Sequence, residues 1–321
     1  MSYYCLSCKE ENDIKIKGVF MVLCAAVCWA LSGIAAQLFF QHFAAAPGIL
    51  VSIRLLSAGV IMILLQSLIQ GTKNAFSVWS HKKDRLTLLV FGLIGMLGVQ
   101  YTFFAAIHHG NAATATLLQY LGPIFIIVYV SLQFRRMPGS RELIAFLLAL
   151  TGIFFMTTSG SVDSLTITLE AFIWGILSAI AAAFYTLFPA KLLKAWGPVS
   201  VVGWSMVIGG VGLSLFHPPW FFDWSQGSLL LFALLAFIVI VGTITPFYLF
   251  LDSLRFVTPA QASILGSAEP LTAVLVTTVF LHTPMDPVQL LGSLCIIVSV
   301  LVLALRSARK DTSGADKTAS G

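Results

Sequence analysis

Residues 112–141 read AATATLLQYLGPIFIIVYVSLQFRRMPGSR, and this stretch contains the pattern that decides the fold. Its first part, 112–133, has no charged residue and is about as long as the roughly 20 residues that a helix needs to cross a bilayer. Arg135, Arg136 and Arg141 follow directly. Because basic residues beside spanning helices stay on the cytoplasmic side, this stretch predicts a membrane helix whose C-terminal end faces the cytoplasm.

The same pattern repeats along the chain and predicts ten membrane helices. All of the 18 Lys and Arg residues except Arg54 lie at the chain ends or in even-numbered connections, and the odd-numbered connections have none. An even number of crossings then places both termini in the cytoplasm. We therefore expect an all-α integral membrane protein. The predicted helices are 18–40, 47–67, 86–107, 112–133, 142–158, 170–190, 198–216, 228–251, 260–281 and 286–305.

The composition agrees with this class and excludes others. Hydrophobic residues make up 58% of the chain and charged residues 10%, whereas soluble domains have about 25% charged residues. The topology explains the net charge of +5, so we expect no nucleic-acid partner. The expected partners of such a membrane protein are lipid and a small-molecule substrate. Cys24, Cys28 and Cys295 lie in predicted spans, and Cys5 and Cys8 lie in the N-terminal segment. They form no metal-ligand set or disulfide framework, so we expect no metal and no cofactor.

The chain also contains an internal repeat. A polar stretch at 159–169 separates two sets of five predicted helices, and the second set matches the first without gaps at an offset of 147 residues. Five is odd, so the two halves enter the membrane from opposite sides, as in many secondary transporters with a site near the midplane. The predicted segments are 1–17, cytoplasmic; 18–158 and 170–306, the repeats; and 307–321, a disordered tail. The matched pairs are Tyr101/Tyr248, Phe103/Phe250, Ala113/Ala260, Ala115/Ala262, Leu118/Leu265, Pro123/Pro270 and Leu143/Leu290.

Glu269 is the charged residue that lies deepest in a predicted span. It is about nine residues into the ninth helix, so roughly 13 Å from the cytoplasmic end. An unpaired carboxylate at that depth is costly, so it is a candidate for proton or cation coupling. The alternative is structural, a protonated carboxyl that satisfies carbonyls freed by Pro270. The offset pairs Glu269 with Gly122, so both halves have a helix-kinking proline, Pro123 and Pro270, and one half has the acid.

Two more charged residues lie within predicted spans. Arg54 is about seven residues, roughly 10 Å, from the external end of the second helix. It either reaches outward or bonds backbone carbonyls, with the binding of an anionic group or an outer gate as the alternative. Asp252 is three residues before Arg255, and a surface ion pair explains it.

Aromatic and polar side chains gather at mid-depth in the helices beside the two prolines. Gln and Tyr side chains need hydrogen-bond partners in hydrocarbon, so this set is a candidate cavity lining, with ordinary packing as the alternative. The predicted substrate-binding residues are Trp29, Ser32, Gln100, Tyr101, Gln119, Tyr120, Trp174, Tyr185, Tyr248 and Arg54.

Two five-helix halves, Arg54, Gly122-Pro123 and Ala268-Glu269-Pro270 together resemble the EamA-type transporters of the drug/metabolite transporter superfamily, over about residues 18–305. The resemblance implies a ten-helix basket of inverted repeats, with a cavity lined mainly by helices one, three, four, six, eight and nine. It also implies a protein of the cell inner membrane that moves amino acids, nucleobase-type metabolites, amines or other small solutes.

These observations predict a secondary active transporter of a small metabolite that works by alternating access. A cationic amine suits the mid-depth aromatic rings and Glu269, and a neutral or aromatic amino acid is the alternative substrate. A passive channel or facilitator, and an intramembrane enzyme or sensor, are the alternative functions. No HExxH, GxSxG or P-loop motif occurs, so we expect no enzymatic activity and no direct use of ATP. Glycines allow close helix contact within one chain or between chains, so monomer and homodimer both stay open. These glycines are Gly92, Gly95, Gly98, Gly209 and Gly212.

Overall fold

The computed structural model describes residues 2–135, 137–159, 167–281 and 285–302, and this part of the chain is helical, with no strand. The predicted tail and most of the predicted connection between the halves lie outside it. The helices of the first half are α1 (Ser2–His42), α2 (Pro47–Gln70), α3 (Thr72–Phe76), η1 (Ser77–Ser80), α4 (Lys82–Val90), η2 (Phe91–Met96), α5 (Leu97–His109), α6 (Ala112–Gln119), α7 (Gly122–Gln133) and α8 (Ser140–Thr158). Those of the second half are α9 (Leu169–Leu187), α10 (Ala190–Trp196), α11 (Pro198–Ser214), η3 (Pro219–Phe221), η4 (Trp224–Gln226), α12 (Leu229–Ala236), η5 (Phe237–Ile244), α13 (Thr245–Ser253), α14 (Pro259–Gly266), α15 (Ala268–Phe280) and a helix at Pro287–Val302.

Seven of the predicted crossings are confirmed as helices that are long and apolar enough to span a membrane. The other three predicted crossings are also helices. The seventh is α11, which meets α10 at an angle of 120°, and the last two are the shorter apolar helices Ile264–Phe280 and Pro287–Val302. The seven are Ile16–His42, Pro47–Gln70, Lys82–His109, Ala112–Gln133, Ser140–Thr158, Leu169–Leu187 and Leu229–Ser253.

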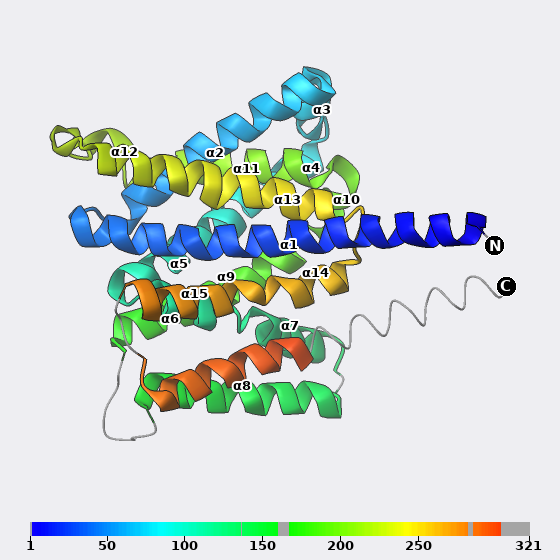
Figure 1. Cartoon of the computed structure of the whole chain (residues 1–321). Helices are drawn as coiled ribbons and strands as arrows, with labels where there is room; N and C mark the ends of the chain where they lie inside the picture. The colour runs from blue at the N-terminus through cyan, green and yellow to red at the C-terminus, as the bar shows by residue number, and fades with distance from the viewer. Residues whose placement is uncertain (1, 136, 160–166, 282–284, 303–321) are drawn as a thin grey trace.

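The N-terminal segment is not separate from the first span. Residues 2–17 continue α1 without a break and carry it beyond the bundle (Figure 1). These residues include no proline or glycine that would end a helix, and the first glycine, Gly18, packs against Phe256 and Val257. The predicted boundary near residue 17 therefore marks a change of composition and not the end of an element.

The repeat is visible as equal helix bounds. Each end of α6, Ala112 and Gln119, lies 147 residues before the matching end of α14, and α7 and α15 both end at matching positions, Gln133 and Phe280. The third and eighth spans each contain a π-helical segment, η2 and η5, at matching positions. In Figure 1, α6 and α7 run from left to right, and α14 and α15 run from right to left. The pair α6 and α7 and the pair α14 and α15 therefore match in order and closely in bounds, and they run in opposite directions.

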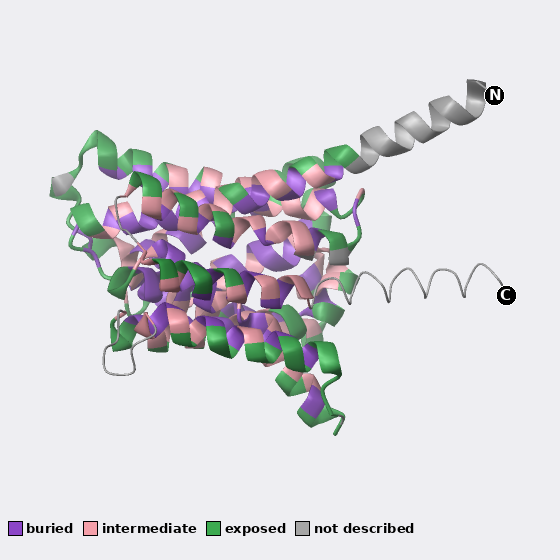
Figure 2. Ribbon diagram, turned by 60° about the horizontal axis from the view of Figure 1, so that its bottom comes forward, coloured by how far each residue is buried: buried purple, intermediate pink, exposed green. Residues whose placement is uncertain are grey.

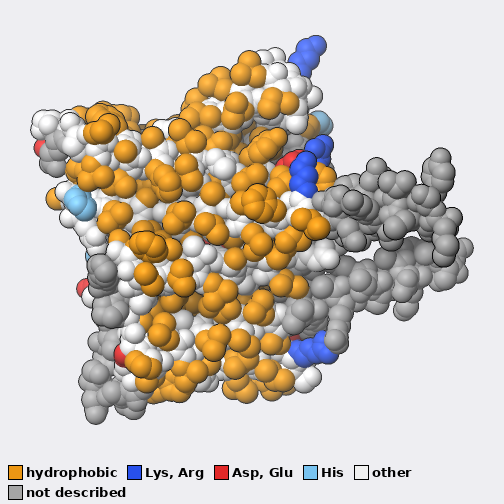
Figure 3. All heavy atoms as spheres, viewed as in Figure 1, with side chains coloured by type: hydrophobic (Ala, Val, Ile, Leu, Met, Phe, Trp, Pro, Cys, Tyr) orange, Lys and Arg blue, Asp and Glu red, His pale blue; other side chains and the backbone are white. Residues whose placement is uncertain are grey.

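The first helix of each half packs against helices of the other half. Helix α1 packs against η5, α13, α14 and α15, and α9 packs against α5, α6 and α7. The helices that the family resemblance assigns to a central cavity therefore lie against one another. Buried residues lie between the helices and exposed ones face outward (Figure 2). A soluble protein rarely exposes so large an apolar surface, but a surface that faces lipid requires it (Figure 3).

Helices α2 and α11 are in backbone contact along their lengths. A Cβ at Gly59 would lie 2.8 Å from the backbone nitrogen of Val207, and a Cβ at Gly210 would lie 2.9 Å from that of Leu56. A Cβ at Gly209 would meet the Gly92 carbonyl oxygen at 2.8 Å. The close contacts of these glycines lie within one chain, as small residues permit in membrane bundles.

Candidate functional site

Glu269 lies where the helix breaks of the two halves meet. It is in the first turn of α15, directly after the break at Ser267, and Tyr120 occupies the matching break between α6 and α7. The Tyr120 hydroxyl oxygen is 3.0 Å from Glu269 Oε2 and 2.7 Å from the Gly266 carbonyl oxygen. This arrangement joins the first half to the second through polar groups in the interior of the helical bundle.

The two breaks follow from the two prolines. A proline within a helix has no N–H for the carbonyl four residues earlier, and its ring clashes with that carbonyl. Pro270 acts on Gly266 in this way, and Pro123 acts on Gln119, which ends α6. The sequence therefore removes the helical donor of a carbonyl at the same position of each half, and at Gly266 the Tyr120 hydroxyl replaces it.

A second polar contact joins the first break to α9. The Gln119 side-chain nitrogen donates to the Ser178 hydroxyl at 2.7 Å, and Ser178 is fully buried. Gln119, Tyr120 and Glu269 are half-buried although they lie among packed helices. Three predicted site residues from two spans are thus brought together and keep accessible surface, and Ser178 adds a contact from a third span.

Two aromatic groups flank this polar layer. Tyr101 packs edge-on against Trp174, with ring centroids 5.5 Å apart, and stacks with His217 on its other side. Trp29 packs against Phe247 and Phe250, both at 5.5 Å. Helices α1, α5, α9 and α13 supply all of these rings except that of His217; α1 packs against α15 and α5 packs against α6, while α13 packs against α1.

The other predicted substrate residues are placed differently. Ser32 is buried against Gly242, Gln100 is buried, and Tyr185 packs against Phe91 with ring centroids 5.2 Å apart. Tyr248 on α13 is 58% exposed, so the structure does not bring it into the aromatic groups beside the polar layer. Its counterpart Tyr101 does belong to one of them.

Arg54 is bonded inside the bundle and does not reach outward. Its side chain is 4% exposed, and Nε donates to the Thr243 hydroxyl at 2.6 Å while Nη2 donates to the Gly242 carbonyl at 3.1 Å. The guanidinium lies over the Phe104 ring, 4.7 Å from its centroid, and interacts electrostatically with Glu269. Arg54 therefore fastens α2 to the π-helical segment η5, where backbone groups are displaced from their α-helical partners.

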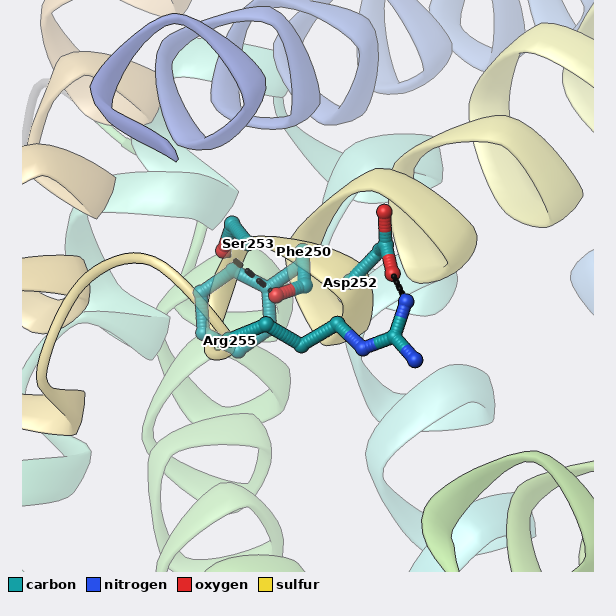
Figure 4. Close-up of polar contacts among 4 residues, drawn as sticks. All are labelled: Phe250, Asp252, Ser253 and Arg255. Carbon is teal, nitrogen blue, oxygen red and sulfur yellow. Dashed lines mark hydrogen bonds and ion pairs between the residues drawn. The ribbon is translucent and has the colours of Figure 1, made fainter. Parts of the chain in front are cut away.

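Asp252 pairs with Arg255 at the surface, as predicted. Arg255 Nη1 lies 3.0 Å from Asp252 Oδ1, the Arg255 side chain is 75% exposed, and the Ser253 hydroxyl donates to the Phe250 carbonyl beside them (Figure 4). This acid is thus outside the candidate site.

The sequence analysis missed several polar groups of the interior. Gln37 Oε1 accepts the backbone N–H of Ala112 at 2.9 Å and so caps the start of α6. Thr243 and Gly266, the partners of Arg54 and Tyr120, were also missed. A glutamine in an apolar span signals that a partner exists, but no local pattern identifies partners far apart in the chain.

A groove of about 480 Å³ lies apart from Glu269, between α7, α8 and α9. Its lining has no polar side chain to orient a polar solute, so it is a poor candidate for the substrate site. The lining residues are Leu121, Ile124, Phe125, Val128, Phe146, Ala149, Leu150, Ile153, Phe172, Ile173, Ile176 and Leu177.

Comparison with known proteins gives the class. The chain is 40% identical to the uncharacterized inner membrane transporter YicL of Salmonella typhimurium, over 92% of this chain and 97% of that one. It is 24% identical to the riboflavin transporter ImpX of Fusobacterium nucleatum, over 91% and 99%. A solved crystal structure superposes with a TM-score of 0.61 at 16% identity, over 93% of this chain and 98% of the other, which shows a shared fold. The protein is a multi-pass membrane transporter and not an enzyme.

The family follows from both halves of the chain. The EamA-like transporter family matches residues 16–158 and again residues 169–305. The chain belongs to this family, so the resemblance seen in the sequence is confirmed.

Proposed function

We propose that this protein is a secondary active transporter that moves a small metabolite across the cytoplasmic membrane by alternating access, with proton coupling at Glu269. In this proposal ten helices cross the membrane, the repeats are 18–158 and 170–306, and both termini are cytoplasmic. The solute is an amino acid, an amine or a related compound.

The contact between Tyr120 and Glu269 carries the proposal. It joins matching helix breaks of two inverted halves, and in many secondary transporters such breaks form the site near the midplane. A carboxyl group there can take up a proton from one side and release it to the other. One proton that moves down 100 mV supplies about 2.3 kcal/mol, which matches a gradient of about 50-fold for a neutral solute.

The charge distribution supports the orientation. On the face seen in Figure 3, the Lys and Arg side chains lie at the end of the bundle where α1 enters. Basic residues beside spans favour the cytoplasmic side, so this end faces the cytoplasm in the proposal.

The surroundings of Glu269 favour an amine or an aromatic solute. Aromatic rings on α1, α5, α9 and α13 can contact a cation or a planar ring, and the carboxylate can balance a positive charge. Riboflavin belongs among the test compounds because ImpX is named as a riboflavin transporter.

A ligand-stabilisation screen identifies the solute. The purified protein is heated with amines, amino acids, nucleobases and riboflavin, and a bound solute raises the melting temperature by mass action. The active compound is then used in proteoliposomes with and without a pH gradient.

Glu269→Gln tests the coupling. We expect the unmodified protein to accumulate solute when a pH gradient is imposed, and Glu269→Gln to lose accumulation while it keeps solute counterflow. Asp252→Asn, which changes a surface acid, is the matched control and should accumulate normally. Wild-type accumulation and an unchanged pH response in Glu269→Gln would contradict the coupling. Counterflow without accumulation in the unmodified protein would instead indicate a passive facilitator.

A further inference from the structure

The Tyr120 hydroxyl lies between two acceptors but has one proton to donate. Its oxygen is 2.7 Å from the Gly266 carbonyl oxygen and 3.0 Å from Glu269 Oε2. A phenol donates one hydrogen bond and can accept others. Both contacts are therefore hydrogen bonds at the same time only when one partner donates to Tyr120, and of the two only a protonated Glu269 can do so.

The Gly266 carbonyl is the group that Pro270 leaves without its helical partner. In a continuous α-helix this carbonyl would accept the N–H of the residue four positions later, which here is a proline. Tyr120 supplies a donor from the other half of the molecule in place of that N–H. The bond therefore links the C-terminal end of α14 to the break between α6 and α7.

We propose that Tyr120 is a positioning residue that converts the protonation state of Glu269 into the presence or absence of this link. When Glu269 is protonated, the carboxyl donates to Tyr120 and Tyr120 donates to Gly266. When Glu269 is ionised, the Tyr120 hydroxyl donates its hydrogen bond to the carboxylate. This charge-assisted bond is stronger than the bond to the Gly266 carbonyl, which therefore loses its donor. Loss of the proton thus removes the hydrogen bond between the end of α14 and the break in the first half. This inference rests on the proposed function, in which Glu269 exchanges protons.

The other charged and titratable groups near Glu269 cannot replace Tyr120 in this role. Arg54 on α2 interacts with Glu269 electrostatically, but bonds to Thr243 and Gly242 hold it in place. Helices α1 and α6 pack against α15. At membrane depth α1 has the titratable thiols Cys24 and Cys28, and α6 has no titratable side chain. Tyr120 is the group with a contact to both Glu269 and α14.

Thiol labelling at the break tests this inference without a known solute. Ser267 connects α14 to α15 and is buried, so the labelling rate of Ser267→Cys reports whether this break becomes accessible. The full chain in nanodiscs is treated with N-ethylmaleimide from pH 5 to pH 9, and the labelling of native cysteines is subtracted. Ser267→Cys combined with Glu269→Gln corrects for the pH dependence of the thiol itself, because the Gln amide donates to Tyr120 at every pH.

The Ser267→Cys variant is the parent in this comparison. We expect the parent to label at least about fivefold faster than its Glu269→Gln version at high pH, and equally fast at low pH. Tyr120→Phe should label fast at both ends of the range, because the phenyl ring has no donor for Gly266. Tyr129→Phe removes a hydroxyl that is 54% exposed on α7 and should behave as the parent. A parent-like response in Tyr120→Phe, or no pH-dependent excess in the parent, would overturn the proposal.

An infrared titration gives a second readout on a chain that keeps Ser267. A protonated-carboxyl band that is lost in Glu269→Gln belongs to Glu269, and Tyr120→Phe should move its titration midpoint while Tyr129→Phe leaves it in place. An unmoved midpoint in Tyr120→Phe speaks against the relay. If Glu269→Gln transports with an unchanged pH response while labelling stays pH-dependent, the coupling proposal fails and the relay stands.

Discussion

For Arg54, the sequence predicts a position inside the membrane but not the hydrogen-bond partners. Its position was evident from the sequence, because it is the basic residue that the topology does not explain. Its partners were not, because Gly242 and Thr243 lie 188 and 189 residues further along the chain. A buried cation signals that hydrogen-bond acceptors exist, but only the fold identifies them.

Arg54→Ala should lower the free energy of unfolding by about 3 kcal/mol, because it removes the two buried hydrogen bonds to Thr243 and Gly242 and the packing over Phe104. Reversible unfolding in mixed micelles measures this effect. Arg255→Ala is the matched control, since Arg255 is exposed at the surface and its loss should cost less than about 1 kcal/mol. Equal losses in the two variants would show that the Arg54 contacts contribute little.

At the scale of elements, close contacts depend on glycine. Gly242 in η5 faces Ser32 of α1, and a Cβ there would lie 2.1 Å from Ser32 Oγ and 2.4 Å from Ser32 Cβ. This contact fixes how closely the eighth span approaches the first, and therefore where the rings of Trp29 and Phe247 meet.

Gly242→Ala should therefore destabilise the protein by about 2 kcal/mol through overpacking, measured as a lower melting temperature and a lower folded yield. Ser32→Gly in the same chain removes the clashing atoms and should restore stability. Gly98→Ala is the control, because its Cβ would lie 3.8 Å from that of Ala181, an ordinary contact. A double variant no more stable than Gly242→Ala would show that the clash is not the cause.

The sequence was sufficient to predict the apolar spans, seven of which the structure confirms as long apolar helices, the offset of the repeat and the positions of the proline-linked breaks. It did not predict the π-helical segments η2 and η5, because a span that is apolar on every side has no periodicity to distinguish the two helix types. It also missed α10, because two helical turns with Lys191 and Lys194 read as a connection. The contact of Tyr120 with Gly266 was not predictable because it is made between the halves.

For the whole molecule, the strongest prediction from the sequence concerns orientation. Alternate connections differ in charge, and the structure places the visible basic side chains at one end of the bundle (Figure 3). No local helical signal carries this information, since it comes from how the chain is inserted into the membrane.

Reporter fusions measure the orientation. Green fluorescent protein fused to the C-terminus should fluoresce, and alkaline phosphatase at the same place should be inactive. Alkaline phosphatase fused after Ala45, between the first and second spans, should be active. The reverse pattern would show that the basic end faces outward.

The backbone contact between α2 and α11 limits how the molecule can move. At Gly59 and Gly210 the two backbones lie too close to admit a Cβ, and a hydrogen bond from Trp196 to Asp84 joins α10 to α4 beside them. Any movement of one half relative to the other must then keep α2 and α11 in contact. Movement between the halves is then left to other contacts, among them the hydrogen bond from Tyr120 to the Gly266 carbonyl at the end of α14.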